Sequence, residues 1–364
     1  MKKSVLILIA LLSVVTLSCC GSGGYDEKWA SYENLGNCIG DNIWDIALHE
    51  GKLFFGTGDG NTNTGPTKIW AYDVNKGEFS ESGTLAEEVI NSFLIIDDKL
   101  VAPGIDPTDK GDNVNYNYYE NGEWKKYSDI GPTDHLFDVV KFNDTYFYGV
   151  DYKIGASPVL SQKEHNGKIA YVPFYKDGEK LSMSSKYVRV FDLVEFKDNL
   201  YAWLTTQSAT SVLSRDIYKY NLEKNCFEYY SSAFDGVKIR NYINFKMIGT
   251  KASGENIMYI ATPEGYYTVN MLSFKKLNFQ KNIVCDFWQE RDNIYALCSR
   301  NVDGKIRTSV WSTKADCPED FKELFYFESD YGCISFAKSG NSFYFGTSDN
   351  MNNGEKGVVL KVTR

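Results

Sequence analysis

This sequence lacks the short motifs that mark several large enzyme classes. It contains no GxSxG nucleophile motif, no HExxH zinc motif, no P-loop and no glycine pattern of the dinucleotide-binding folds. Only 3 of its 364 residues are histidines, and they are scattered, so a histidine metal site is not expected. A hydrolase that uses two carboxylates stays open, because acids from distant segments leave no local motif. The sequence therefore leans towards a protein that is not an enzyme without settling the question.

Basic charge, proline and helical periodicity are also scarce. Lys and Arg number 39 against 48 Asp and Glu, which gives a formal net charge of −9, and no basic stripe is present. Nucleic acid is therefore not expected as a partner, because its binding requires clustered positive charge. Only 8 prolines occur, whereas 26 Tyr and 22 Phe favour β-strands. With 43% hydrophobic residues, the chain has enough apolar side chains for a large folded core.

Long apolar runs are absent except at the N-terminus. Residues 5–17 are apolar, follow a positively charged start, and are too few for a comfortable membrane span, as in an export signal. The run leads into Leu17, Ser18, Cys19 and Cys20. These four residues resemble the lipobox of bacterial lipoproteins, in which a cysteine becomes the lipidated N-terminus.

The lipobox resemblance implies that Cys20 carries the lipid, with Cys19 as the alternative site and an ordinary cleaved signal as a further alternative. It implies export to the bacterial cell envelope and attachment to a membrane through the N-terminal lipid only. The sequence does not specify the membrane leaflet. The expected organisation is a signal peptide with the lipidation cysteine over residues 1–20, a Gly- and Ser-rich flexible tether over 21–27, and a single domain over 28–364.

A hairpin pattern that recurs seven times is the clearest positive feature. In residues 191–203 an apolar strand is followed by a polar turn at 197–199 and a second apolar strand. Equivalent positions in successive copies are 36 to 58 residues apart. A repeat near 40–50 residues built of strands is typical of β-propeller blades. The other copies are residues 43–57, 90–103, 137–149, 242–262, 284–297 and 334–347.

Two further strand patterns follow most hairpins, but the last module has only one, at residues 358–362. An additional strand pattern at residues 28–32 precedes the first module. We therefore predict an all-β fold, a seven-bladed β-propeller of four-stranded blades in which an N-terminal strand completes the C-terminal blade and removes two exposed edges. Six or eight blades, or two separate β-domains, are the alternatives. The longer segments 151–168 and 205–215 are expected to be surface loops.

The blade entrances carry the candidate ligand-binding residues. In a propeller, the loops after the second strands and between the blades share one face, at the channel mouth, and function usually concentrates on such loops. An acid, an imidazole and guanidinium groups at this place are suited to an anionic or sugar-like ligand, whereas a solvated rim is the plainer alternative. The residues aligned just before the inner strands are Glu88, His135, Arg189 and Arg240.

The loops after the second strand of the first and last modules share a common frame. Asp59, Asn61 and Asn63 alternate in the first loop, and Asp349 occupies the last, as oxygen ligands do in calcium loops. Neither loop has the spacing of an EF-hand, and the same residue types serve ordinary tight turns. Calcium is the one cofactor that the sequence suggests, with plain turn chemistry as the alternative.

One aspartate position recurs in the inner strands. It is occupied by Asp45, Asp138, Asp192 and Asp286. Repetition in several blades favours a structural role, such as binding a neighbouring backbone amide, because a catalytic site needs its residue only once.

Six cysteines follow the signal segment, without the spacing of a zinc site. If the hairpin at residues 284–297 turns tightly, Cys285 and Cys298 lie opposite each other on adjacent strands. An exported compartment permits a disulfide between them, and two free thiols fit the sequence equally well.

Residues 58–66 and 101–107 resemble segments of uncharacterised exported propeller proteins of bacteria, and the resemblance extends in detail over residues 42–150. It implies the fold but no activity, and kelch double glycines, WD dipeptides and sialidase Asp-boxes are absent. The expected function is that of a lipid-anchored cell-envelope propeller that binds or scaffolds a glycan or a protein. The alternative is a hydrolase or lyase acting on a carbohydrate or small polar substrate at the channel mouth. A purely structural envelope component with bound calcium is a third interpretation.

Overall fold

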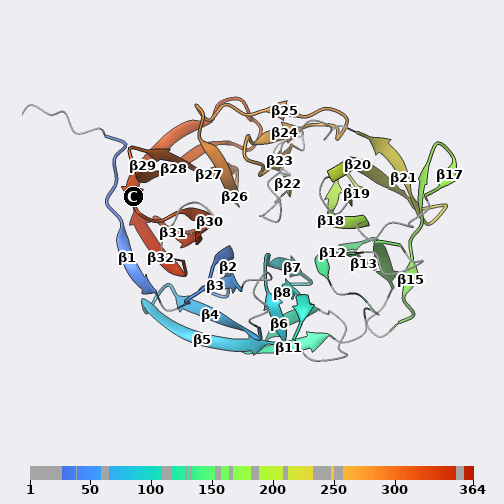
Figure 1. Ribbon diagram of the computed structural model, residues 1–364, viewed down its shortest axis with the longest axis horizontal. Coiled ribbons are helices and arrows are strands. Elements are labelled where there is room, and N and C mark those ends of the chain that lie inside the picture. The colour runs from blue at the N-terminus through green and yellow to red at the C-terminus, as the bar shows by residue number, and fades with distance from the viewer. Residues whose placement is uncertain are drawn as a thin grey trace, which may run out of the picture.

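The chain forms a ring of seven small β-sheets in the computed structural model (Figure 1). The structure describes residues 27–37, 39–58, 65–108, 116–127, 130, 133, 135–151, 157–163, 167–181, 188–207, 212–232, 247–249, 257–349 and 356–364. Within these ranges no helix has the length and apolar character needed to cross a membrane. The predicted signal peptide with Cys19 and Cys20, and the tether up to residue 26, lie outside the described residues. The predicted seven-bladed β-propeller is confirmed.

Each blade is an antiparallel sheet of four strands whose first strand lies innermost (Figure 1). In blade 2, a separate pair formed by β6 (Glu87–Val89) and β9 (Ile105–Pro107) lies next to the four-stranded sheet. The strands of blades 1 to 3 are β2 (Ile43–His49), β3 (Lys52–Thr57), β4 (Thr67–Asp73) and β5 (Glu78–Leu85), then β7 (Leu94–Ile96), β8 (Lys99–Pro103), β10 (Tyr116–Glu120) and β11 (Glu123–Tyr127), then β12 (Leu136–Phe142), β13 (Thr145–Val150), β14 (Val159–Gln162) and β15 (Ala170–Tyr171).

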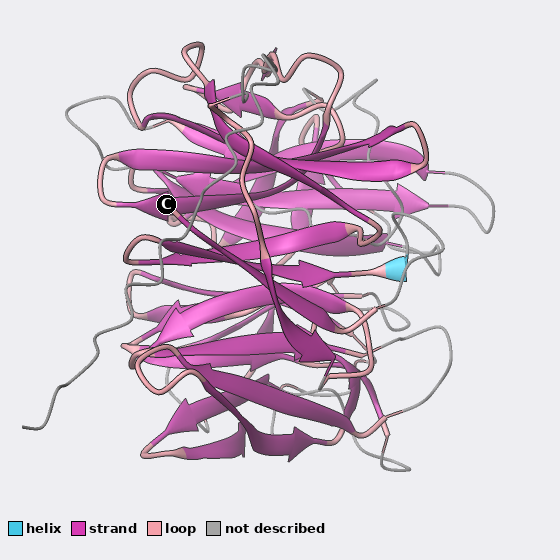
Figure 2. Cartoon of the chain, turned by 90° about the vertical axis from the view of Figure 1, so that its left-hand side faces the viewer, coloured by secondary structure: helices cyan, strands magenta, loops and turns pink. Residues whose placement is uncertain are grey.

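Blade 4 is enlarged, because the hairpin of β16 (Phe174–Lys176) and β17 (Glu179–Lys180) adds to its outer edge through a parallel pairing of β16 with β21. Figure 2 shows the strands of successive blades stacked around the ring. The strands of blades 4 to 6 are β18 (Val188–Phe196), β19 (Asn199–Gln207), β20 (Val212–Asn221) and β21 (Cys226–Ser231), then β22 (Met247–Gly249), β23 (Met258–Ile260), β24 (Tyr266–Thr268) and β25 (Lys275–Lys276), then β26 (Ile283–Glu290), β27 (Asn293–Val302), β28 (Lys305–Lys314) and β29 (Lys322–Ser329).

Blade 7 contains β30 (Cys333–Ser339), β31 (Ser342–Thr347) and β32 (Val358–Thr363), and β1 (Glu33–Asn37) supplies its outermost strand. The N-terminal closure of the ring is therefore confirmed. The closing strand is formed by residues 33–37, however, and its prediction at residues 28–32 is wrong. Those residues run beside β29 of blade 6 instead, where the Ala30 amide donates to the Tyr326 carbonyl at 2.8 Å. The N-terminal segment thus spans two blades in succession.

Two segments expected to be surface loops contain strand residues, and parts of both lie outside the described residues. Residues 151–168 include β14, the third strand of blade 3, and residues 205–215 are mostly the ends of β19 and β20. Both segments are polar enough to resemble loops in sequence. Their strand conformation follows from pairing with the apolar strands on either side, which the local sequence does not encode.

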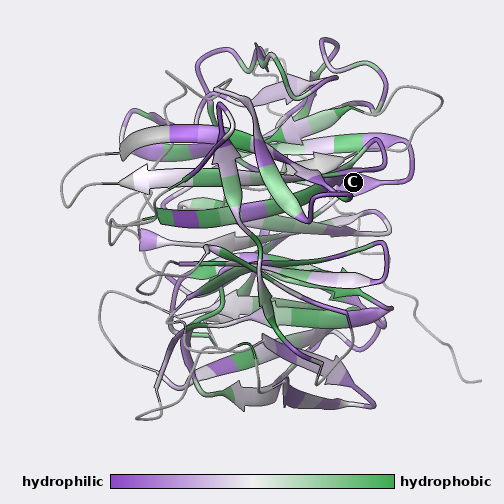
Figure 3. Ribbon diagram, turned by 90° about the vertical axis from the view of Figure 1, so that its right-hand side faces the viewer, coloured by the Kyte–Doolittle hydropathy of each residue, from purple (hydrophilic) through white to green (hydrophobic). Residues whose placement is uncertain are grey.

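Apolar side chains fill all seven interfaces between neighbouring blades. Figure 3 shows hydrophobic residues along the strands and hydrophilic residues mainly in turns and loops. Each four-stranded sheet is too small to bury both of its faces alone, so it depends on the blades on either side. The ring therefore holds together through contacts between blades.

A one-residue bulge interrupts the pairing of the two inner strands at the same place in blades 1, 3, 4, 6 and 7. A bulge redirects the unpaired side chain. Trp44, Phe137 and Ile334 occupy this position, and they pack with Val89 and Ile105 into an apolar cluster on the inner side of the ring. Apolar side chains from four blades thus meet where the inner strands converge.

In blades 1, 3 and 6 the residue after the bulge is an aspartate that connects neighbouring blades. Asp45 accepts a hydrogen bond from the Phe93 amide of blade 2 at 2.8 Å, and Asp138 accepts one from the Leu193 amide of blade 4 at 2.7 Å. Asp286 makes the equivalent bond between blades 6 and 7. Each aspartate also accepts the amide that follows it in its own strand. The structural role predicted for the recurring aspartates is confirmed at these three positions.

Glycine lies opposite two of these aspartates, where the next blade approaches closely. Gly56 pairs with Asp45, and Gly149 pairs with Asp138. A Cβ atom at either glycine would lie 2.8 Å from a carbonyl oxygen of the following blade. Any larger residue would therefore push neighbouring blades apart.

Asp192 departs from this pattern. The Leu193 amide that follows it already donates to Asp138, and the Oδ2 atom of Asp192 is buried without a hydrogen-bond partner in the described part of the chain. Burial raises the pKa of both carboxyl groups, and the charge of Asp138 raises the pKa of Asp192 further. Asp192 therefore keeps its proton to a higher pH than Asp138, whose two amide donors favour the charged form.

The bulge in blade 6 determines whether Cys285 and Cys298 lie opposite each other. Because the bulge falls at Cys285, the residue opposite Cys298 is Val284. Cys285 and Cys298 are both free thiols, so of the two expectations from the sequence the disulfide is wrong. Burial raises the pKa of the Cys298 thiol well above its usual value.

Candidate functional site

Five charged side chains from blades 2, 3 and 4 meet at one end of the inner strands. The pairing of β6 with β9 holds the two residues of blade 2 on adjacent backbones. The remaining three residues lie at the entrances to β12 and β18 and at the end of β13. We call this group the channel-mouth cluster, and its members are Glu88, Asp106, His135, Asp151 and Arg189.

Backbone bridges between blades set the positions of these residues. Ile105 forms an isolated antiparallel bridge with His135, and Asp151 forms one with Arg189. Each bridge joins the segment after the second strand of one blade to the entrance of the next. Side chains that follow the second strands are therefore held beside those at the entrances.

His135 is the centre of the cluster. Its Nε2 atom lies 3.1 Å from Oδ1 of Asp106, and its Nδ1 atom lies 2.7 Å from Oδ2 of Asp151. The Thr133 hydroxyl donates to Oδ1 of Asp151 at 2.6 Å. Both ring nitrogens thus face carboxylates, which is the arrangement of an imidazolium that donates twice. His135 connects blade 2 to blade 3 as a charged clamp.

The pKa values of the clamp follow from this geometry. Burial opposes the charged imidazole, but the hydrogen bonds to Asp106 and Asp151 outweigh it and raise the pKa of His135 to about 9. Burial likewise opposes the Asp151 carboxylate, yet the His135 partner lowers the pKa of Asp151 to about 2. The clamp is therefore ionised throughout the physiological pH range.

Glu88 and Arg189 lie beside the His135 clamp. Burial, and then the negative charge of Asp106, raise the pKa of the half-buried Glu88, with His135 acting in the opposite direction. The guanidinium carbon of Arg189 lies 5.7 Å from the centre of the Phe137 ring. Its Nε atom is buried and has no hydrogen-bond partner among the residues that the structure describes. The Arg189 guanidinium therefore retains a hydrogen-bond donor that no described residue uses.

Two aromatic rings lie beneath the charged groups. The His135 ring is stacked on Phe137, with centroids 5.6 Å apart and planes 9° from parallel. Phe191, two residues after Arg189 in β18, lies 4.7 Å from Phe137. Cation–π contacts of this kind hold a guanidinium or imidazolium in place without using its hydrogen-bond donors. The cluster thus combines an aromatic surface with acidic and basic groups.

The structure brings together three of the four residues predicted at the channel mouth. Glu88, His135 and Arg189 belong to one cluster, and their role in binding stays a prediction; Arg240 lies outside the described residues. Sequence reasoning missed Asp106 and Asp151. Asp151 directly follows a second strand, and Asp106 follows Ile105, which is bridged to a blade entrance. An alignment of these positions across the modules could have found both residues.

The predicted calcium ligands are placed only in part. Asp59, Asn61 and Asn63 lie outside the described residues. The Asp349 amide donates to Asn42 at 3.0 Å, and the Lys356 ammonium lies 3.7 Å from the Asp349 carboxylate. Within the described ranges no group of three or more His, Cys, Asp or Glu side chains is arranged to hold a metal ion. The Asp349 carboxylate thus already has a cationic neighbour, and calcium stays a proposal.

Comparison with known proteins gives the fold alone. No model of a known protein family matches the sequence, and no curated protein is significantly similar to it. A chain in the crystal structure of a mitotic checkpoint complex is similar in fold, with a TM-score of 0.53, 9% identity and 99% of both chains covered. Kuenenia stuttgartiensis hydrazine synthase gives a TM-score of 0.52 at 11% identity, covering 89% of this chain and 96% of that one. Chaetomium thermophilum Sqt1 gives 0.51 at 12% identity, covering 92% and 98%. At these identities the similarity extends to the β-propeller architecture and to no activity.

Proposed function

We propose that this protein is a binding module of the bacterial cell envelope and that its channel-mouth cluster binds a glycan carrying a carboxylate group. Arg189 carries the proposal, because its buried Nε atom has no hydrogen-bond partner in the described part of the chain. A guanidinium binds a carboxylate through two parallel hydrogen bonds. His135 contributes little to ligand contact, because its two ring nitrogens are already engaged by Asp106 and Asp151.

The neighbouring groups suit the rest of a sugar ring. Phe137 and Phe191 offer aromatic surface against which the C–H face of a sugar packs. Glu88 and Asp106 supply oxygen atoms that accept hydrogen bonds from hydroxyl groups. Because the chain carries a net charge of −9, attraction of an acidic glycan depends on the local arginine and not on long-range charge.

Isothermal titration calorimetry of the purified full-length chain tests this proposal. Oligosaccharides containing uronic acid should bind, and their neutral counterparts should bind more weakly. Arg189→Ala should weaken binding of the acidic oligosaccharides about tenfold or more, as expected for loss of a charge-assisted pair. Arg300→Ala is the matched control, because Arg300 also has a buried Nε atom without a partner but lies in blade 6. Equal binding of neutral and acidic sugars, or an unchanged affinity of Arg189→Ala, would overturn the proposal.

A hydrolase or lyase acting at the same place is the second candidate, favoured by the raised pKa of Glu88. A carboxyl group whose pKa is raised keeps its proton to a higher pH and can act as a general acid, and an arginine can neutralise the carboxylate of an acidic sugar. Incubation with the bound oligosaccharide decides between the two functions. Release of shorter fragments that Glu88→Gln abolishes would make the protein an enzyme, and an intact ligand would leave it a binding module.

The proposed location rests on the lipobox resemblance of residues 17–20. Partition of the expressed chain into a detergent phase, followed by mass spectrometry of its N-terminal peptide, tests the anchor. Cys20→Ala should abolish lipidation and Cys19→Ala should not. Lipid on neither cysteine would remove the membrane from the proposal.

A further inference from the structure

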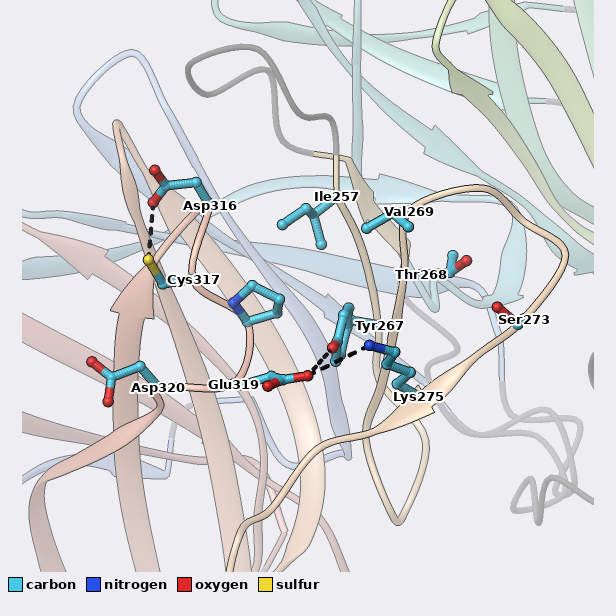
Figure 4. Close-up of a pocket in the computed structure, with 11 residues that line it drawn as sticks. Ile257, Tyr267, Thr268, Val269, Ser273, Lys275, Asp316, Cys317, Glu319 and Asp320 are labelled. Carbon is cyan, nitrogen blue, oxygen red and sulfur yellow. Dashed lines mark hydrogen bonds and ion pairs between the residues drawn. The ribbon is translucent and has the colours of Figure 1, made fainter.

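A second site lies on the opposite face of the ring, independent of the proposed function. A pocket of about 460 Å³ opens between blades 5 and 6 (Figure 4). One wall is β24, the start of β25 and the loop between them, and the other is the connection from β28 to β29. Connections from third to fourth strands leave a blade at the end opposite to those from second to third strands. The pocket is therefore remote from the channel-mouth cluster.

The lining of the pocket is mixed, with apolar residues beside polar and charged ones. Its aliphatic members are Ile257, which is buried, and Val269, which is 38% exposed. Leu272, in the same loop as Val269, is 53% exposed. These two side chains offer apolar surface at and beside the cavity for the body of a bound molecule.

An ammonium group of the protein itself already rests in this pocket. The Lys275 Nζ atom lies 5.7 Å from the centre of the Tyr267 ring and 3.6 Å from Oε1 of Glu319 (Figure 4). The Tyr267 hydroxyl donates to the same carboxylate at 2.5 Å, and the Glu319 side chain is 73% exposed. An aromatic face with an adjacent carboxylate is the usual receptor for an ammonium ion. Lys275 thus reveals which chemical group the pocket accepts.

Lys275 is held only weakly. Its side chain is 68% exposed, and an exposed ion pair of this kind contributes little. The same three residue types recur nearby, where the ammonium group of Lys276 lies 2.7 Å from Glu264, and Glu264 also accepts the hydroxyl of Tyr266. That second group is tighter and does not line the pocket. Only the group facing the pocket combines a loosely held ammonium with an adjoining apolar space.

We infer that the pocket between blades 5 and 6 binds a primary ammonium group carried on an apolar body, and that the incoming ammonium displaces Lys275 from Tyr267 and Glu319. The apolar body packs on Ile257 and Val269. Two sources share this chemistry, a free aralkyl amine and a lysine side chain next to an apolar residue in a peptide.

Cys317 provides a built-in reporter of occupancy. It lines the pocket, and among the described cysteines it is the one classed as exposed. The measurement is the rate at which a neutral disulfide reagent modifies Cys317 in the full-length chain, followed by peptide mass spectrometry. The probes are 2-phenylethylammonium, its uncharged counterpart 2-phenylethanol, 3-phenylpropionate and the peptide acetyl-Phe-Lys-amide. Rates are compared with and without each probe, so intrinsic differences in thiol reactivity cancel.

We expect at least one of the two ammonium probes to slow modification of Cys317 about fivefold or more, and the alcohol and carboxylate to leave it unchanged. The stronger ammonium probe identifies the source of the ligand. Glu319→Gln should remove the protection, and Glu264→Gln should retain it. Lys275→Met should reduce the concentration needed for protection, because the internal competitor is gone, whereas Lys276→Met should not. Protection by neither ammonium probe, equal protection by the alcohol, or weaker protection in Lys275→Met would each overturn the inference.

Discussion

Two junctions between neighbouring blades contain a cation, a carboxylate and an aromatic ring, yet they differ in how firmly these groups are held. At the channel mouth, His135 lies between Asp106 and Asp151 and is stacked on Phe137, with 19% of its side chain exposed. In the pocket between blades 5 and 6, Lys275 lies beside Glu319 with 68% of its side chain exposed.

The difference shows that position within the ring controls how strongly a cation and a carboxylate interact. Near the inner strands the blades converge and exclude water, so each charge depends on its partner. At the outer end the blades diverge, and water screens the charges. The inner junction is therefore suited to holding the ring together, and the outer junction is suited to exchange with a ligand.

The largest expected effect comes from breaking the inner clamp. His135→Ala leaves two carboxylates facing each other in a partly buried place and should lower the free energy of unfolding by about 3 kcal/mol. Lys275→Ala should leave the urea midpoint unchanged within error, because its partner remains in contact with water. Urea unfolding followed by tryptophan fluorescence measures both variants. Similar losses of unfolding free energy in the two variants would show that burial does not make the inner junction more stabilising than the outer one.

The pH dependence of the clamp sharpens the contrast. The pKa of His135 is raised to about 9, so its stabilisation is complete below pH 6.5, its usual pKa, and is lost as the pH rises towards 9. Between pH 6.5 and pH 8 the loss should be roughly 2 kcal/mol. The pKa of Asp151 is lowered to about 2, so its contribution is present above pH 4 and disappears as the pH falls towards 2.

The difference in unfolding free energy between the parent and His135→Ala, measured from pH 6 to pH 9, isolates this contribution from other titrating groups. The difference should shrink as the pH rises. A difference that stays constant across this range would mean that His135 is neutral in the folded protein.

The smallest expected effect concerns Asp192, whose Oδ2 atom has no hydrogen-bond partner among the described residues of the junction of blades 3 and 4. Asp192→Asn should change stability by less than about 0.5 kcal/mol near neutral pH, because the amide resembles the protonated acid. Asp286→Asn should cost about 1 kcal/mol, since the side chain then accepts less strongly from the Phe336 amide of blade 7. Thermal denaturation compares the two variants. A larger loss in Asp192→Asn would show that Asp192 is ionised and bound by a group outside the described residues.

Much of the fold could be read from the sequence because its signals are local. Alternating apolar residues and polar turns define each hairpin over about ten residues, and the pattern recurs at blade spacing. The strand that closes the ring could be anticipated but not placed, since β1 pairs with residues more than 300 positions away. The motif at residues 28–32 resembles an outer strand, yet it runs beside β29 because the ring geometry brings the chain past blade 6 first.

The candidate sites were less predictable. Glu88, His135 and Arg189 could be identified because the blade entrances align with the repeat, whereas Asp106 and Asp151 enter the cluster through bridges between blades. The cysteine prediction failed because a single bulge at Cys285 changes the register of β26 and β27. Nothing in the local sequence indicates the pocket between blades 5 and 6, because its two walls come from different blades.

By itself, the sequence determined that this chain forms strands, how many modules it has and which residues recur in each, because these features depend on contacts within a few residues of chain. Only the tertiary structure decided which charges meet and how deeply they are buried. His135 gains its partners, and Lys275 its loose hold, from the packing of one blade against the next. Electrostatic strength depends on the exclusion of water, and water is excluded only once the ring has closed.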